Sequence, residues 1–231
     1  MNTITKTVGP VRFMKKSPTV ITLMGEVDTD MVSKFVEEFN VAVASGQPVI
    51  PLIIHSDGGD LYDAIYIINC LKTATVPIAT IVTGQAYSAA ALIFSAGTEG
   101  YRFMAKNASI MLHDVGIEEV SGKCNDIEVE AEELRRTNRM VYRIMAENTG
   151  KRHNFFLNKV RGIRGADLYV DSAQALRWNL ANVVGVPQLV TTVHVKMQLT
   201  LGDVPLGQSA EKGFHTGEGD SKRRRVDEDD A

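Results

Sequence analysis

Short apolar runs and amphipathic stretches alternate along the first part of the chain. Three apolar runs are rich in β-branched residues and have the length of strands, at 19–24, 48–54 and 78–82. Each is followed by a stretch with helical spacing, at 31–46, 60–72 and 88–97, and Asp28 or Thr29 can cap the first of these helices. The order strand, turn, helix predicts an α/β fold of stacked parallel βαβ units, with functional groups in the turns at the carboxyl ends of the strands.

The second half of the chain predicts fewer strands and one long helix. We expect a short strand, a long helix, a final helix and a final strand, at 109–112, 125–148, 172–179 and 182–186. One stripe of the long helix is apolar, which predicts a single partner face formed by Ile127, Ala131, Leu134, Val141 and Met145.

Composition divides the chain into four parts. We expect an N-terminal segment, one main domain, an extension with the alternation of a half-buried strand, and a disordered charged tail, at 1–18, 19–190, 191–202 and 203–231. In the tail, the basic run 222–225 lies beside the acidic run 227–230. A solvated tail that neutralises itself therefore explains these charges better than a nucleic-acid patch does.

The overall composition is that of an ordinary globular protein. The chain has 231 residues, of which 44% are hydrophobic and 23% charged, and its net charge of -3 gives no reason to expect nucleic acid or an anionic membrane as a partner. No apolar run is long enough for a secretory signal or a membrane span. Cys70 and Cys124 lack metal-ligand spacing, so we expect no metal, no cofactor and a reducing, cytoplasmic compartment.

A serine lies at the turn between the third predicted strand and its helix. Ser88 stands in the segment GQAYSAAA, where small residues permit a sharp bend that leaves Oγ projecting at the head of the helix. Amides at a helix start would favour a developing oxyanion. A serine in this position is more often a simple N-cap, so both interpretations of Ser88 are open.

Two further turns carry residues suited to acyl transfer. His113 follows the predicted strand 109–112, where it could accept the proton of a serine if a carboxylate fixed its tautomer, although a buried structural histidine has the same pattern. His55 is the rival candidate for the general base, and it lies one residue before the turn that contains Gly58 and Gly59. Those glycines permit close approach of the backbone to a ligand and could donate an N–H to an oxyanion, but they could equally form a plain turn.

Taken in order along the chain, these features resemble one family, the proteolytic subunit of the Clp protease, which belongs to the crotonase-like superfamily. The similarity covers about 20–190 and rests on GEVDTDM, HSDGGDLYDAIYI, GQAYSAAALIFSAGTEGYRF, SIMLHD, NDIEVEAEELRRTNRMVYRIMAENTG and DLYVDSAQAL. The segment around Ser88 is the most specific of them. The resemblance implies an α/β fold of stacked βαβ units from which the long helix protrudes as a handle.

The resemblance also implies a serine endopeptidase that hydrolyses peptide bonds through an acyl-enzyme. It implies roles for five residues: Ser88 as the nucleophile, His113 as the general base, Asp167 as the third member of the triad, and the backbone amides of Gly59 and Ala89 as the oxyanion hole. Asp171 is the nearest rival of Asp167.

Assembly and partners follow from the same resemblance. Two stacked rings of seven chains, interlocked by the long helix, would enclose a chamber in which unfolded polypeptides are cut, delivered by an ATP-driven (AAA+) Clp unfoldase. The sequence departs from the family's pattern at three places. Asp114-Val115 stands where Gln-Pro is usual, Arg164-Gly165-Ala166 lacks an acidic-basic pair, and 1–18 matches the axial-gate segment poorly.

Three alternative functions stay open. The chain could be a dedicated maturation peptidase, such as those that process virus shells, working without an unfoldase. It could be an acyl-CoA hydratase or isomerase of the same superfamily, a reading that needs no Ser-His-Asp set and that the presence of all three residues disfavours. It could also be an inactive ring subunit that serves as a scaffold. Natural substrates and cleavage preference are not predicted.

Overall fold

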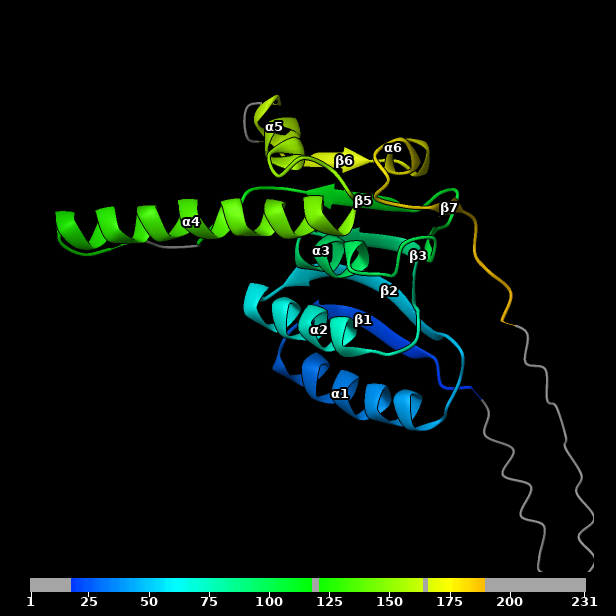
Figure 1. Ribbon diagram of the computed structural model, residues 1–231. Coiled ribbons are helices and arrows are strands. Elements are labelled where there is room, and N and C mark those ends of the chain that lie inside the picture. Colours follow the sequence, from blue (N-terminus) through cyan, green and yellow to red (C-terminus); the bar gives the residue numbers. More distant parts are fainter. Residues whose placement is uncertain (1–17, 118–120, 164–165, 190–231) are drawn as a thin grey trace, which may run out of the picture. The chain divides into compact units, whose positions relative to one another are not determined.

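A mostly parallel sheet forms the centre of the fold (Figure 1). The computed structural model describes residues 18–117, 121–163 and 166–189, which all belong to one compact unit of the chain. Five of the strands in this part pair side by side, all parallel, in the order β1 (Ile21–Val27), β2 (Ile50–Gly59), β3 (Ile78–Tyr87), β4 (Arg102–Met104) and β7 (Val183–Val184). The predicted α/β fold of parallel units is confirmed.

The long strand β3 has two successive neighbours on one side. Its first half pairs with β4, and its second half pairs in parallel with β5 (Ser109–Leu112), with Tyr87 opposite Met111. The short strand β6 (Leu168–Val170) then pairs antiparallel with β5, with Leu112 opposite Leu168. This branch of the sheet brings the ends of β3 and β5 and the start of β6 together.

Helices follow the first three strands as predicted. They are α1 (Thr29–Ala44), α2 (Leu61–Thr73) and α3 (Ala89–Ser95), and each buries apolar side chains in a shared core, among them Phe35, Ile67 and Phe94. The carboxylate of Asp28 accepts the Met31 N–H at 2.8 Å and so caps α1, while that of Asp60 caps α2. Both helices therefore begin where a side chain satisfies their first free amides.

Three strands continue past the ends of their apolar runs. We expected them to stop at Met24, Ile54 and Val82, and this is wrong, because β1 continues to Val27, β2 to Gly59 and β3 to Tyr87. The pairing of β2 with β3 shifts its register between Ile54 and Ser56 and then resumes. An irregularity of this kind lets polar and glycine residues stay in the ladder after the apolar run has ended.

Three short elements have no clear signal in the sequence and were not predicted. They are β4, β6 and α5 (Phe155–Arg161). The two strands have three residues each, too few to display a period, and they are defined by the neighbours with which they pair. The final predicted helix and strand are confirmed in shortened form, as α6 (Ser172–Arg177) and β7.

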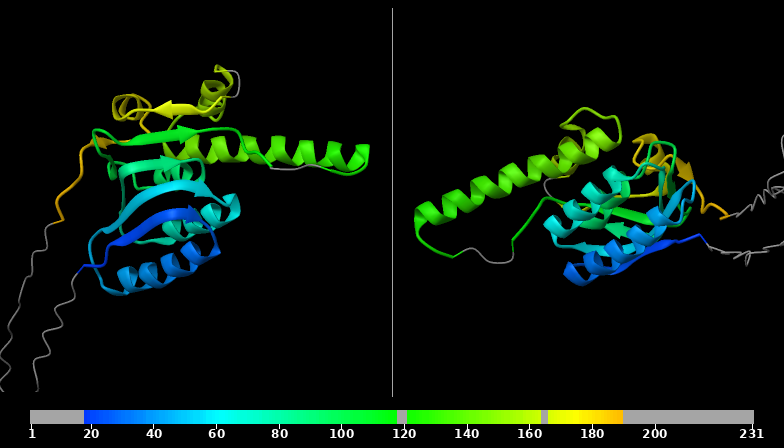
Figure 2. Two further views of the ribbon diagram at one scale, coloured as in Figure 1. Left: turned by 180° about the vertical axis from the view of Figure 1, so that it is seen from behind. Right: turned by 60° about the horizontal axis from the view of Figure 1, so that its bottom comes forward.

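The long helix α4 (Cys124–Asn148) projects away from the sheet (Figures 1 and 2). Its buried residues all lie in its second half: Thr137, Tyr142, Met145 and Ala146. In the first half, Ile127 is 41% exposed and Val129 is 67% exposed. Among the described residues, the predicted apolar stripe is therefore buried only near the C-terminal end of the helix.

A buried arginine joins the C-terminal elements to the sheet. Arg102, in β4, has no exposed surface and donates to the backbone carbonyls of Gly97, Asn179 and Leu180, at 2.9 to 3.1 Å. Its guanidinium also contacts Glu99 at 2.6 Å. Because the charge is satisfied by several acceptors at once, it can be buried without an unpaired donor.

Some predictions lie outside the described residues. These are the N-terminal segment up to residue 17, the strand at 193–201 and the charged tail over 203–231. Within the described part, no helix combines the length and apolar character needed to cross a membrane.

Candidate active site

Ser88 lies between the end of β3 and the start of α3, in an unusual backbone conformation. Its φ of 51° and ψ of -121° lie in a region that residues with a side chain rarely adopt. Such a backbone conformation costs about 1–3 kcal/mol, and conformations of this kind cluster at functional sites. The Ser88 side chain makes no capping hydrogen bond to α3. The turn is held instead by the Ser88 N–H, which donates to the Met111 carbonyl at 2.9 Å. Ser88 is therefore not an ordinary N-cap, and its hydroxyl is free for another partner.

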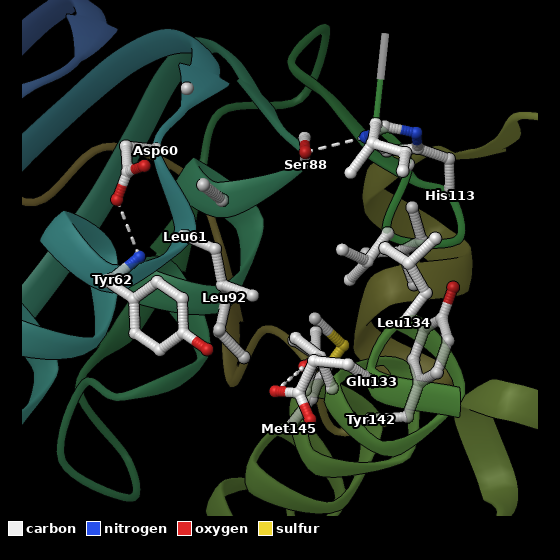
Figure 3. A pocket seen from close by; sticks show the side chains of 18 of the residues that line it. Asp60, Leu61, Tyr62, Ser88, Leu92, His113, Glu133, Leu134, Tyr142 and Met145 are labelled. Carbon is white, nitrogen blue, oxygen red and sulfur yellow. Dashed lines mark hydrogen bonds between the residues drawn. The ribbon is translucent and has the colours of Figure 1, made fainter. Parts of the chain in front are cut away.

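That partner is His113. Since β5 runs parallel to β3 with Met111 opposite Tyr87, the residue following β5 lies beside the turn that holds Ser88. The Nε2 atom of His113 lies 2.6 Å from Ser88 Oγ, and both residues are half-buried (Figure 3). This is the hydrogen bond that a general base makes to a serine nucleophile.

Gly58 packs directly against the turn. A Cβ atom added to it would lie 2.7 Å from the Tyr87 carbonyl oxygen and 2.8 Å from Ser88 Cβ, so a side chain would push the serine out of place. Its φ of +101° also favours glycine. The Gly58 N–H donates to Ser56 Oγ at 3.0 Å, which fixes the strand end on which the next amide lies.

The two amides expected to form an oxyanion hole border the same cavity as Ser88 and His113. Ala89 is the first residue of α3, and an amide at that position has no acceptor within its helix. Gly59 is the last residue of β2, with a φ of +146° and with the Val27 backbone where a side chain would be. The fold thus places Gly59, Ala89 and Ser88 around the same cavity.

Asp167 is exposed and lies one residue before β6. Leu112 and Leu168 are the last pair between β5 and β6, so the next step of that antiparallel register would put Asp167 opposite His113. No hydrogen bond joins these two side chains among the contacts of the described residues. The position of Asp167 in the fold is compatible with a triad, whereas the hydrogen bond that would complete the triad is not formed.

The two rivals are held elsewhere. Asp171 accepts the Gln174 N–H at 2.7 Å as the N-cap of α6, which gives its carboxylate a structural role. His55 is an exposed residue of β2, and its ring lies over Gly84, where an added Cβ would come within 2.5 Å of Nδ1.

A cavity of about 400 Å³ opens beside Ser88 and His113. Figure 3 shows side chains from α3 and α4 on its walls, and most of the lining is apolar, including Leu92, Leu112, Leu134, Val141 and Met145. Three acidic residues of the described part of the chain also border it: Asp60, which caps α2, Glu130, and Glu133, whose carboxylate is paired with Arg136 and accepts from Thr137. The aliphatic walls of the cavity are suited to an apolar side chain.

The hydrogen bonds that Asp114 makes next to His113 were not predicted from the sequence. The Asp114 carboxylate accepts from Asn138 Nδ2 at 2.8 Å and from the Tyr142 hydroxyl at 3.2 Å. Asn138 and Tyr142 are four residues apart in α4, so the sequence predicts that they lie on one face of the helix. It does not predict which segment they bind. Within the described residues, no cluster of three or more His, Cys, Asp or Glu side chains is arranged to hold a metal ion.

Comparison with known families agrees with this geometry. A family model described as Clp protease matches residues 11–188, which is more than half of the chain. The match spans every element from β1 to β7, including the turn at Ser88 and the residue His113. The chain therefore belongs to the Clp protease family and is, in general type, a serine peptidase.

Proposed function

We propose that this chain is a serine endopeptidase in which Ser88, His113 and Asp167 form a catalytic triad. The observation that carries the proposal is the 2.6 Å contact between His113 Nε2 and Ser88 Oγ, made by a serine at positive φ that does not cap its helix. Strained backbone conformations of this kind cluster at functional sites. Membership of the Clp protease family supports the same reaction class.

The proposed reaction is acyl transfer in two steps. Ser88 Oγ attacks the carbonyl carbon of a peptide bond while His113 Nε2 takes the hydroxyl proton, and the oxyanion is held by the Gly59 and Ala89 amides. The C–N bond then breaks and His113 returns the proton to the leaving amine. Water, deprotonated by His113, attacks the acyl carbon, the ester bond to Ser88 Oγ breaks, and His113 returns the proton to Oγ. Asp167 would accept a hydrogen bond from Nδ1 once substrate or assembly brings the two side chains into contact.

The proposed substrate is an unfolded polypeptide with an apolar residue next to the bond that is cut. Support comes from the cavity beside Ser88, whose walls are mainly aliphatic side chains. Of the three described acidic residues on its border, Asp60 caps α2 and Glu133 is paired with Arg136. An apolar side chain that enters the cavity leaves water for contact with these aliphatic walls, which is favourable.

We also propose that the chain assembles into stacked heptameric rings that are served by an ATP-driven unfoldase. This assembly is supported by the projecting first half of α4, where Val129 and Ile127 expose apolar surface that the described residues do not cover. A maturation peptidase without an unfoldase has the same catalytic site. Degradation of a stably folded substrate, assayed with and without a Clp-type unfoldase and ATP, distinguishes the two.

Labelling with a fluorophosphonate tests the catalytic assignment. We expect the reagent to modify Ser88 in the assembled protein, and Ser88→Ala to lose both labelling and peptide cleavage, the latter by about 10⁶-fold. Ser33→Ala is the matched control, because Ser33 is an exposed serine of α1 that bonds only to the Thr29 carbonyl. Undiminished cleavage by Ser88→Ala, or an unlabelled wild type in an assay where an active serine peptidase reacts, rejects the proposal.

A further inference from the structure

The segment that follows His113 is tied to α4 by three hydrogen bonds. Asn138 uses both ends of its amide, since its Nδ2 donates to Asp114 Oδ1 at 2.8 Å and its Oδ1 accepts the Val115 N–H at 3.1 Å. One turn further along the helix, the Tyr142 hydroxyl donates to the same Asp114 oxygen at 3.2 Å. Two residues of α4 therefore hold the two residues after His113.

This connection lies beside the substrate cavity, which Tyr142 also borders. His113 and Val115 border the cavity, while the carboxylate of Asp114, between them, is bonded to α4. Tyr142 is only 1% exposed, and burial, with a smaller contribution from Asp114, raises the pKa of its hydroxyl. The phenol keeps its proton and remains a donor to the carboxylate.

His113 lies after the end of its strand, so contacts other than strand pairing must hold it in place. Leu112 is the last residue of β5, and the ladder with β6 ends at the same residue. The backbone from His113 to Val115 has no strand partner within the described residues. Hydrogen bonds to a carboxylate are stronger than those between neutral groups, so the bonds of Asp114 are well suited to fix this segment.

We infer that Asp114 is a positioning residue, which fastens the backbone after His113 to Asn138 and Tyr142 of α4 and thereby keeps the imidazole Nε2 within reach of Ser88 Oγ. The inference rests on the proposed function, since it gives Asp114 a role through the proposed general base. It also assigns a use to a residue that differs from the Gln usual in the family at this position.

Replacing Asp114 tests the inference in the full-length protein. For Asp114→Ala we expect kcat to fall by about 10²-fold with KM little changed, because substrate binding is intact while the base is misplaced. In a crystal structure of the variant, the distance from His113 Nε2 to Ser88 Oγ is expected to exceed hydrogen-bond length. Asp114→Asn keeps one acceptor oxygen in place and is expected to retain most of the activity.

An exchange of side chains separates positioning from a general loss of stability. Asn138→Asp alone puts two carboxylates face to face and is expected to lower kcat. The double variant Asp114→Asn with Asn138→Asp restores an amide-carboxylate pair with the partners reversed, and we expect it to recover kcat toward the wild-type value.

Two results would overturn the inference: wild-type kcat in Asp114→Ala, or an imidazole that stays 2.6 Å from Ser88 Oγ in the crystal structure of that variant. A wild type that neither labels nor cleaves peptides would reject the proposed function instead. Even then, the imidazole position in the variant crystal structures decides whether Asp114 positions His113.

Discussion

Contacts with a few single residues hold Ser88 in a backbone conformation that serine does not favour. The positive φ of Ser88 is maintained by the hydrogen bond from its N–H to Met111 and by the close fit of Gly58 against Tyr87 and Ser88. Because the surrounding structure over-determines the turn, the cost of the strained backbone is met by neighbouring contacts. The nucleophile is thus sensitive to changes in residues that take no part in the chemistry.

Gly58→Ala tests this sensitivity. The new Cβ would lie 2.7 Å from the Tyr87 carbonyl oxygen, so the turn must shift, and we expect kcat to fall by about 10²-fold. Gly46→Ala is the control, because Gly46 also has positive φ, +72°, but has nothing within 4 Å of an added Cβ. The control should lose about 1–2 kcal/mol of folding free energy and no activity per folded molecule. Equal activity of both variants would mean that Gly58 does not support the serine.

Asp167→Asn distinguishes the two candidates for the third catalytic residue. If Asp167 orients the His113 imidazole, the variant should lose about 10⁴-fold in kcat, since an amide favours the wrong tautomer. Asp171→Asn should keep its activity, because asparagine caps a helix as well as aspartate does and Asp171 already caps α6. Steady-state peptide cleavage measures both. The opposite pattern would assign the role to Asp171.

At the level of whole elements, the site depends on how β3, β5 and α4 meet. The register of β5 on β3 delivers His113 to Ser88, and the second half of α4 both walls the cavity and bonds to the segment after His113. One helix face therefore affects both the shape of the cavity and the placement of the base. We expect substitutions in α4 to separate into those two effects.

Leu134→Ala should change specificity rather than catalysis. Leu134 borders the cavity, so removing its side chain enlarges the space beside Ser88, and the ratio of kcat/KM for a bulky over a small apolar residue should rise by about 10-fold. Leu176→Ala removes the same atoms from a 46% exposed position in α6 and should leave the ratio unchanged. Cleavage of a peptide series varied at one residue measures the ratio. A parallel change in the control would show that the cavity is not the binding site.

At the scale of the whole molecule, the described residues leave apolar side chains of α4 uncovered. Its first half projects from the sheet (Figure 2), and Ile127 is 41% and Val129 67% exposed. Exposed apolar side chains on a projecting helix are typical of a surface that packs against another protein chain. Such packing is also what the proposed ring assembly requires.

Native mass measurement tests the assembly. We expect the wild type to have the mass of seven or fourteen chains and Val129→Glu to form smaller species, because a buried carboxylate without a partner opposes association. Val41→Glu is the control, placing the same charge at a 59% exposed position of α1. A wild type that is a stable monomer at the concentration of the activity assay would contradict the ring proposal.

The sequence by itself determined the features that depend on neighbouring residues along the chain. The alternation of apolar runs and helical stretches predicted the parallel βαβ order, β5 was predicted with its observed bounds, and Asp28 was one of the two caps considered for α1. Hydrophobic periodicity and capping act over a few residues, so they can be read locally. The order of motifs along the chain, which resembles that of the family, identified Ser88 as a candidate nucleophile and His113 as a candidate base.

Only the tertiary structure decided what depends on pairing between distant segments. Strand pairing extends β1 to Val27, β2 to Gly59 and β3 to Tyr87, past the ends of their apolar runs. Helix α4 holds Asp114 through residues more than twenty positions away, and within the described part of the chain no residue of the first half of that helix is buried. Whether Ser88 was a cap or was bonded to a histidine depended on the register of β5 against β3, a long-range property that no local pattern encodes.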